Sequence, residues 1–115
     1  MALLNDFVLI DSEQRAKESP ATWAHTPAEQ LDLIRVGYFV KVGVAHPKMT
    51  GERFWGEVKN LTDNGMEIAV QQDMVHTALH GLSDKDTLMV QRRHVFGICD
   101  KSGDFVWTTM MPERK

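Results

Sequence analysis

The sequence predicts an α+β fold in which one or two amino-terminal helices pack on a strongly bent, mostly antiparallel sheet of five or six strands, with a partly open small barrel as one form of that sheet. Helix signals are concentrated in the first third of the chain, where Thr26 and Pro27 precede a short apolar stripe. After Gly37, apolar residues alternate with a period of two, and turn residues such as Asn64-Gly65 separate the strand-like runs.

The composition favours one globular domain that spans residues 1–115. Hydrophobic residues make up 43% and charged residues 25% of the chain, as in an ordinary globular protein. The net charge of -3 disfavours strong non-specific attraction to nucleic acids, because phosphate binding requires an excess of lysine and arginine. No apolar run reaches the roughly 18 residues of a membrane span, and Cys99 is the only cysteine. We therefore expect a cytosolic protein without an intrachain disulfide.

Two helices are expected before residue 37. Asp11, followed three residues later by Gln14, fits a capping box and predicts a short helix through Glu18. For the second helix, Thr26 is the expected cap and Pro27 the first helical residue, because proline has no N–H to leave unpaired there. This helix is expected to end near residue 35.

Strands are expected on both sides of this helical region. The apolar residues 1–10 lack a basic leader and are interpreted as a strand. Gly37 is expected to close the second helix in the left-handed conformation. Residues 38–44 then alternate between apolar and other side chains, which predicts a strand with one buried face.

The aromatic pair Phe54 and Trp55 lies near the start of the next expected strand, Arg53 to Leu61. Successive strand residues face opposite sides of a sheet, so both faces must be covered here, and we expect Trp55 to anchor the core. Asn64-Gly65 predicts a tight hairpin turn with positive φ angles. The strand after the turn is expected to place its alternate residues inward, namely Met66, Ile68 and Val70.

The rest of the chain is expected to hold one long loop and three short strands. Gln71 to Lys85 shows no sustained period and is interpreted as a crossing loop. A hairpin loop with aspartate and glycine at residues 100–104 is expected between the last two strands. The expected strands are Thr87 to Gln91, Val95 to Cys99 and Phe105 to Thr108, and residues 109–115 are expected to form a frayed tail.

The order of four segments, Thr26–Glu29, Val36–Val42, Gly51–Trp55 and Val95–Ile98, resembles the bacterial family called domain of unknown function 2314. The resemblance covers about Thr22 to Asp100. It implies a small α+β domain and no particular activity, because that family has no agreed catalytic residues.

Catalytic, metal and cofactor sites are not expected. Asp73, His76 and His80 could share a metal ion only on a helix, since strand spacing would separate the two histidines by roughly 13 Å. They are interpreted as loop residues, although whether this loop binds anything stays open. Cys99 has no neighbouring base in the sequence and is interpreted as a small buried residue. We therefore expect a protein that is not an enzyme.

A protein partner or self-association is the expected function. Trp107, Met110 and Met111 form an apolar carboxyl end that either packs on the sheet or contacts a partner. His76 and His80 lie in the long loop, the second candidate contact region.

The alternative is a small nucleic-acid-binding barrel. It would use a basic strip at Arg92 and Arg93, with Lys41 and Lys59 nearby and an aromatic ring for base stacking. The acidic charge balance makes this the second choice.

Overall fold

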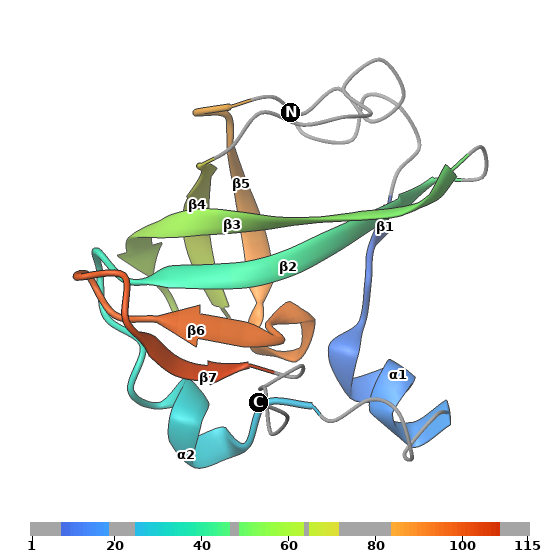
Figure 1. The fold of residues 1–115 in the computed structure, drawn as a ribbon, viewed down its shortest axis with the longest axis horizontal. Coiled ribbons are helices and arrows are strands. Elements are labelled where there is room, and N and C mark those ends of the chain that lie inside the picture. Colours follow the sequence, from blue (N-terminus) through green and yellow to red (C-terminus); the bar gives the residue numbers. More distant parts are fainter. Residues whose placement is uncertain (1–7, 19–24, 47–48, 64, 72–83, 109–115) are drawn as a thin grey trace.

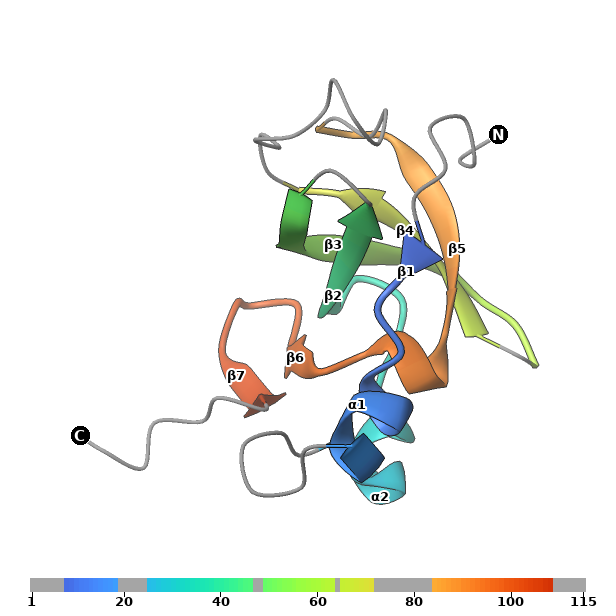
Figure 2. The ribbon, with the colours of Figure 1, turned by 90° about the vertical axis from the view of Figure 1, so that its right-hand side faces the viewer.

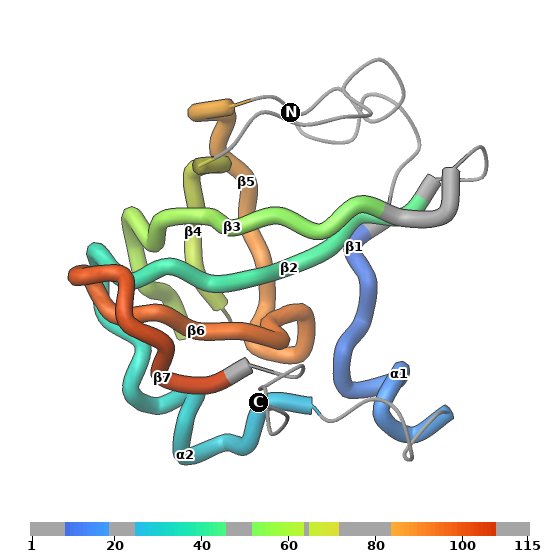
Figure 3. Tube along the Cα trace, viewed as in Figure 1, coloured from blue at the N-terminus to red at the C-terminus, as the bar shows by residue number. Residues whose placement is uncertain are grey.

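The structure is a computed structural model that describes residues 8–18, 25–46, 49–63, 65–71 and 84–108. Figure 1 shows the elements as a ribbon, and Figure 3 shows the path of the chain between them. In chain order the elements are β1 (Val8–Leu9), α1 (Ser12–Glu18), α2 (Ala28–Leu31), β2 (Phe39–His46), β3 (Met49–Leu61), β4 (Gly65–Val70), β5 (Thr87–Gln91), the 3-10 helix η1 (Arg92–His94), β6 (Gly97–Cys99) and β7 (Phe105–Thr108).

The strands form one antiparallel sheet in the order β5-β4-β3-β2-β6-β7, and β1 pairs with the far end of β2. Among the described strands, the two ends of this order, β5 and β7, do not pair with each other, so the sheet does not close. The predicted α+β fold with a bent antiparallel sheet is confirmed.

The sheet bends strongly between β3 and β4. In Figure 1, β4 and β5 run nearly across the direction of β2 and β3, and Figure 2 shows the resulting curvature. The register of this pair shifts between Val58 and Asn60, which leaves Lys59 as an extra residue on β3. Such a bulge increases the local twist and bends a strand. The bend turns one face of the sheet inward around the core.

The core is built by alternate residues of each long strand. On β2, Val40, Val42 and Val44 are completely buried, and the inward residues predicted for the third strand, now β4, are also buried. Leu31 and Ile34, at and just after α2, close the open side of this core. The alternation predicted for β2 and β4 is therefore confirmed. The strand predicted at Thr87–Gln91 is also present, as β5.

The first helix begins as predicted, whereas the second does not. Asp11 accepts a hydrogen bond from the main-chain N–H of Gln14 through Oδ1 (3.0 Å), as expected of a cap. Helix α2 is a single turn whose cap residue is Pro27, without a side-chain cap. Thr26 instead donates its hydroxyl to the main-chain carbonyl of Val95 (2.7 Å). The prediction that Thr26 caps a helix to residue 35 was wrong, because a long-range bond takes its hydroxyl. Gly37 does have a positive φ of 94°, as predicted.

The β3–β4 turn is displaced by one residue from its predicted position. The main-chain N–H of Thr62 donates to the carbonyl of Gly65 (2.9 Å), so Gly65 closes the turn instead of lying within it. Gly65 belongs to β4 and has no positive φ. Glycine is needed here because a Cβ would collide with the main-chain carbonyl oxygen of Val90 on β5. Close approach between strands, rather than turn geometry, explains this glycine.

Phe54, rather than Trp55, anchors the core. Phe54 is 1% exposed and belongs to the core cluster, whereas Trp55 is only partly buried. Because β3 alternates, one of the two rings had to face away from the core, and the pairing of Val42 with Phe54 places Phe54 inside. The prediction that Trp55 anchors the core was therefore wrong.

Candidate functional site

The face of the sheet that points away from the core carries a row of side chains across four strands. One row of this face runs across β3, β2, β6 and β7. In the strand register, Phe39 of β2 pairs with Glu57 of β3 on one side and with Cys99 of β6 on the other. Cys99 in turn pairs with Phe105 of β7. In the next row, Lys41 lies directly opposite Trp55. Strand pairing thus brings residues that are up to 66 positions apart in the sequence, from Phe39 to Phe105, to one surface.

An open groove of about 410 Å³ lies on this surface, and we call it the outer-face groove. Its lining residues are Phe39, Trp55, Gln71, Cys99, Gly103 and Phe105. The rings of Trp55 and Phe105 are tilted by 60° with centroids 6.0 Å apart, a common attractive arrangement. Phe105 is 59% exposed, so this aromatic pair presents apolar area to a ligand.

Two cations of this region lie beside aromatic rings, and one of these rings is Trp55 of the groove. The Nζ of Lys41 is 5.8 Å from the centroid of the Trp55 ring, and the guanidinium carbon of Arg53 is 5.8 Å from that of Phe96. Burial lowers the pKa of Lys41, and the neighbouring charge of Arg53 lowers it further. Lys41 is therefore a partly buried cation beside an aromatic ring.

Cys99, at the bottom of the outer-face groove, has the properties of an unreactive thiol. It is 7% exposed, and burial raises its pKa, as do the charges of Asp100 and Asp104. The thiolate is the nucleophilic form of cysteine, and a raised pKa keeps the thiol protonated at neutral pH. The Asp100 carboxylate has a structural role, since its Oδ1 accepts main-chain hydrogen bonds from Ser102 (2.9 Å) and Asp104 (3.1 Å) in the hairpin loop.

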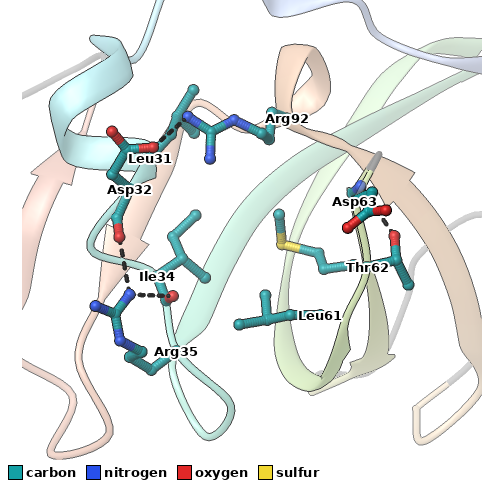
Figure 4. Close-up of a pocket in the computed structure, with 10 residues that line it drawn as sticks. Leu31, Asp32, Ile34, Arg35, Leu61, Thr62, Asp63 and Arg92 are labelled. Atoms are coloured by element: carbon teal, nitrogen blue, oxygen red, sulfur yellow. Dashed lines mark hydrogen bonds and ion pairs between the residues drawn. The ribbon is translucent and has the colours of Figure 1, made fainter.

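A second, smaller cavity of about 210 Å³ lies between α2 and the end of the β3–β4 hairpin (Figure 4), and we call it the α2 pocket. Its apolar lining comes from both sides and includes the core residues Leu31, Ile34 and Met66. Arg35 and Arg92 also line it, so this pocket connects the core with a charged rim.

The basic strip that the sequence suggested is divided and largely ion-paired. On η1, Arg92 bonds to Asp32 Oδ1 (2.8 Å) and Arg93 lies 3.5 Å from Asp11 Oδ2. Lys59 lies 3.2 Å from Glu57 on β3. Lys41 faces Trp55 instead. Arg92 and Arg93 therefore hold the amino-terminal segments against η1.

Of the predicted protein-contact residues, Trp107 lies on β7 opposite Ile98 and is partly buried. The others, Met110, Met111, His76 and His80, lie outside the described residues, as does Asp73. Within the described ranges, no group of three or more metal-ligating side chains could hold a metal ion, and no helix is both long and apolar enough to cross a membrane.

The outer-face groove was not predicted from the sequence. The sequence indicated only that one aromatic ring of β3 faces away from the core. Alternation places Phe54 and Trp55 on opposite faces, but it does not say which of the two is exposed. The residues next to Phe39 and Phe105 in the sequence do not indicate that these two side chains share a groove, because only the pairing of β2, β6 and β7 brings them together.

Comparison of the chain with protein-family models, with curated proteins and with solved structures finds no match. The resemblance to the domain of unknown function 2314 family therefore stays a prediction.

Proposed function

We propose that the protein is a cytosolic, non-catalytic binding module whose outer-face groove binds a short segment of a partner protein, one that carries an aromatic side chain next to a carboxylate. The observation that carries this proposal is the aromatic pair of Trp55 and exposed Phe105 beside the ammonium group of Lys41.

The aromatic part of the ligand is argued from the groove itself. Aromatic residues dominate the energetics of protein interfaces because they bury large apolar areas. A third ring that packs over Trp55 and Phe105 would contact both aromatic side chains and cover the most exposed large apolar residue of the described chain. Phe39 and Cys99 provide an apolar floor for it.

The carboxylate is argued from charge. Among the described residues, Lys41 forms no ion pair, and its nearest charged influence is another cation, Arg53. A partner carboxylate would compensate the charge of Lys41 at a partly desolvated position, where such pairs contribute more than at a fully exposed surface.

Single-stranded nucleic acid is a second candidate, because cations beside stacking aromatic rings also describe surfaces that bind it. The residues concerned would be Lys41 and Trp55 rather than Arg92 and Arg93, which are ion-paired. The net charge of -3 favours the protein ligand.

A displayed peptide library tests the proposal. Selected peptides are expected to share an aromatic residue next to Asp or Glu. By fluorescence anisotropy, Phe105→Ala and Lys41→Gln should each weaken binding at least fivefold, the change that a contact of about 1 kcal/mol produces. Met89→Ala is the matched control, because Met89 is 55% exposed but lies on β5.

Three outcomes would overturn the proposal. The first is a set of peptides whose binding changes equally in Phe105→Ala and Met89→Ala. The second is the selection of no peptide at all. The third is binding of single-stranded oligonucleotides, weakened steeply by salt and by Lys41→Gln, which would establish the second candidate.

A further inference from the structure

The 3-10 helix η1 contacts both amino-terminal helices. Arg93 lies 3.5 Å from Oδ2 of Asp11, the residue before α1, and α1 packs against η1. Figure 2 shows η1 as the orange turn between β5 and β6, next to α1. Towards α2, Arg92 Nη2 bonds to Asp32 Oδ1 at 2.8 Å (Figure 4) and to the main-chain carbonyl of Ala28 at 3.4 Å.

A further bond to the amino-terminal region depends on the shape of η1. Val95 follows η1, and its N–H donates to the carbonyl of Arg92 (3.2 Å), which closes the turn. The carbonyl of Val95 accepts the hydroxyl of Thr26 (2.7 Å). The next N–H, that of Phe96, donates to the carbonyl of Lys41 on β2 (3.0 Å). The turn therefore connects the segment before α2 to the sheet.

His94 closes η1 through a reciprocal pair of hydrogen bonds. Its Nδ1 accepts the main-chain N–H of Gln91 (3.0 Å), and its own N–H donates to the side chain of Gln91. Such a capping box satisfies N–H groups that a helix start would otherwise leave unpaired. Because Nδ1 is the acceptor, the neutral ring carries its proton on Nε2, and a second proton must bind at Nδ1. That proton removes the acceptor.

The surroundings of His94 disfavour this second proton while η1 is closed. Burial lowers the pKa of His94 and Arg93 lowers it further, whereas Asp11 raises it. The Asp11 carboxylate already accepts the N–H of Gln14 and pairs with Arg93. A cavity of about 190 Å³ lies beside His94, and its other lining residues are uncharged: Thr62, Gly65, Met89, Val90 and Gln91. The ring thus binds a proton more readily once η1 opens to water.

We propose that η1 acts as a pH switch, in which protonation of His94 opens η1 and releases α1 and α2 from the sheet while β2, β3 and β4 stay paired. The switch is closed above pH 6.5, roughly the value at which an exposed histidine titrates, and opens as the pH falls below it. Opening uncovers Leu31 and Ile34, which close one side of the core. This device does not depend on the function proposed for the outer-face groove.

Amide hydrogen exchange of the full-length protein, measured by NMR at pH 7.5 and pH 5.5 and corrected for intrinsic rates, tests the proposal. The amides of Leu31 and Asp32 report on α2, because they bond to the carbonyls of Pro27 (3.1 Å) and Ala28 (3.0 Å). The amide of Val58, bonded to the carbonyl of Tyr38 (2.8 Å), reports on the sheet.

At pH 5.5 the protection of the two α2 amides should fall about fivefold or more. A histidine that titrates only in the open form favours opening about tenfold at one pH unit below its ordinary pKa. These amides should also stay far less protected than the amide of Val58. Low concentrations of urea should hardly change their exchange, because a local opening exposes little surface.

Two substitutions of His94 separate the acceptor from the proton. His94→Asn keeps an acceptor near Nδ1 but does not titrate, so protection of Leu31 and Asp32 should change less than about twofold between the two pH values. His94→Leu has no acceptor and should already show at pH 7.5 the weak α2 protection of the parent protein at pH 5.5. Protection of the Val58 amide establishes that each variant is folded, and His94→Asn decides the test if His94→Leu does not fold.

His25→Asn is the matched control. His25 is also partly buried with a lowered pKa, caused by burial against the opposing charges of Glu13 and Asp11, but its ring contacts Ser12 rather than η1. This variant should keep the pH response of the α2 amides.

Three results would overturn the proposal. In the first, the α2 amides are as protected as the amide of Val58 and equally sensitive to urea, so that acid acts only through global unfolding. In the second, His94→Asn responds to pH as the parent protein does, or His25→Asn alone removes the response. In the third, the parent protein has the same α2 protection at both pH values.

Discussion

The buried hydroxyl of Thr26 donates a hydrogen bond to the main-chain carbonyl of Val95, 69 residues further along the chain, at 2.7 Å. This bond joins the segment before α2 to the segment that leads into β6. Thr26 is 1% exposed, so water cannot replace the bond if the hydroxyl is removed.

Thr26→Val is therefore expected to destabilise the protein by about 1 to 3 kcal/mol, because it leaves the buried carbonyl of Val95 without its partner. Thr26→Ser keeps the donor and should cost clearly less. Urea denaturation of both variants measures the difference. A larger loss in Thr26→Ser than in Thr26→Val would show that the methyl group, rather than the hydrogen bond, is what Thr26 contributes.

Phe54 and Trp55 are expected to differ in their contribution to stability. Phe54→Ala should cost about 3 to 5 kcal/mol, because it empties a completely buried position in the core. Trp55→Ala should cost roughly 1 to 2 kcal/mol, because this ring is only partly buried. Thermal unfolding of the two variants gives the comparison, and a larger loss for Trp55→Ala would contradict the assignment of the two faces.

Gly65→Ala is expected to destabilise the β4–β5 pair by about 1 to 3 kcal/mol, because the added methyl group would force the Val90 carbonyl away. Hydrogen exchange of the β5 amides should accelerate more than that of β2. Lys101→Ala, in the exposed hairpin loop, serves as a control with little expected effect. Uniform acceleration in all strands would instead indicate a global loss of stability without a local cause.

Acid is expected to destabilise the protein through His94 and His25. Burial lowers the pKa of His94, and Arg93 lowers it further, while Asp11 raises it. Its Nδ1 accepts the main-chain N–H of Gln91 (3.0 Å), which a protonated ring nitrogen could not do.

The pKa of His25 is likewise lowered by burial, against the opposing charges of Glu13 and Asp11, and its ring contacts the hydroxyl of Ser12. In both cases the unfolded chain binds protons more readily than the folded one. Stability should thus be complete above the unfolded pKa of about 6.5 and should fall as the pH decreases below it.

This pH dependence is checked by measuring the urea concentration at the midpoint of unfolding between pH 7.5 and pH 5.0. His94→Asn keeps an acceptor near the position of Nδ1 but does not titrate, so it should reduce the loss of stability in this range. A midpoint that falls equally in the parent protein and in His94→Asn would remove His94 from this explanation.

The sequence by itself determined the features that depend on neighbouring residues. Alternation identified the buried valines of β2 and the inward residues of β4, and Asp11 was correctly identified as a cap. The left-handed Gly37 was also predicted, because its backbone conformation follows from local geometry.

Only the tertiary structure decided which face of β3 is buried, what the hydroxyl of Thr26 bonds to, and why residue 65 is glycine. The same holds for the outer-face groove, since Phe39, Cys99 and Phe105 meet through the pairing of three strands that are far apart in the sequence. The physical reason is that alternation gives two equivalent faces to every strand. Which face is buried, and which side chains become neighbours, depends on strand register and on the apolar area that the sheet buries. Residues from the whole chain contribute to that area.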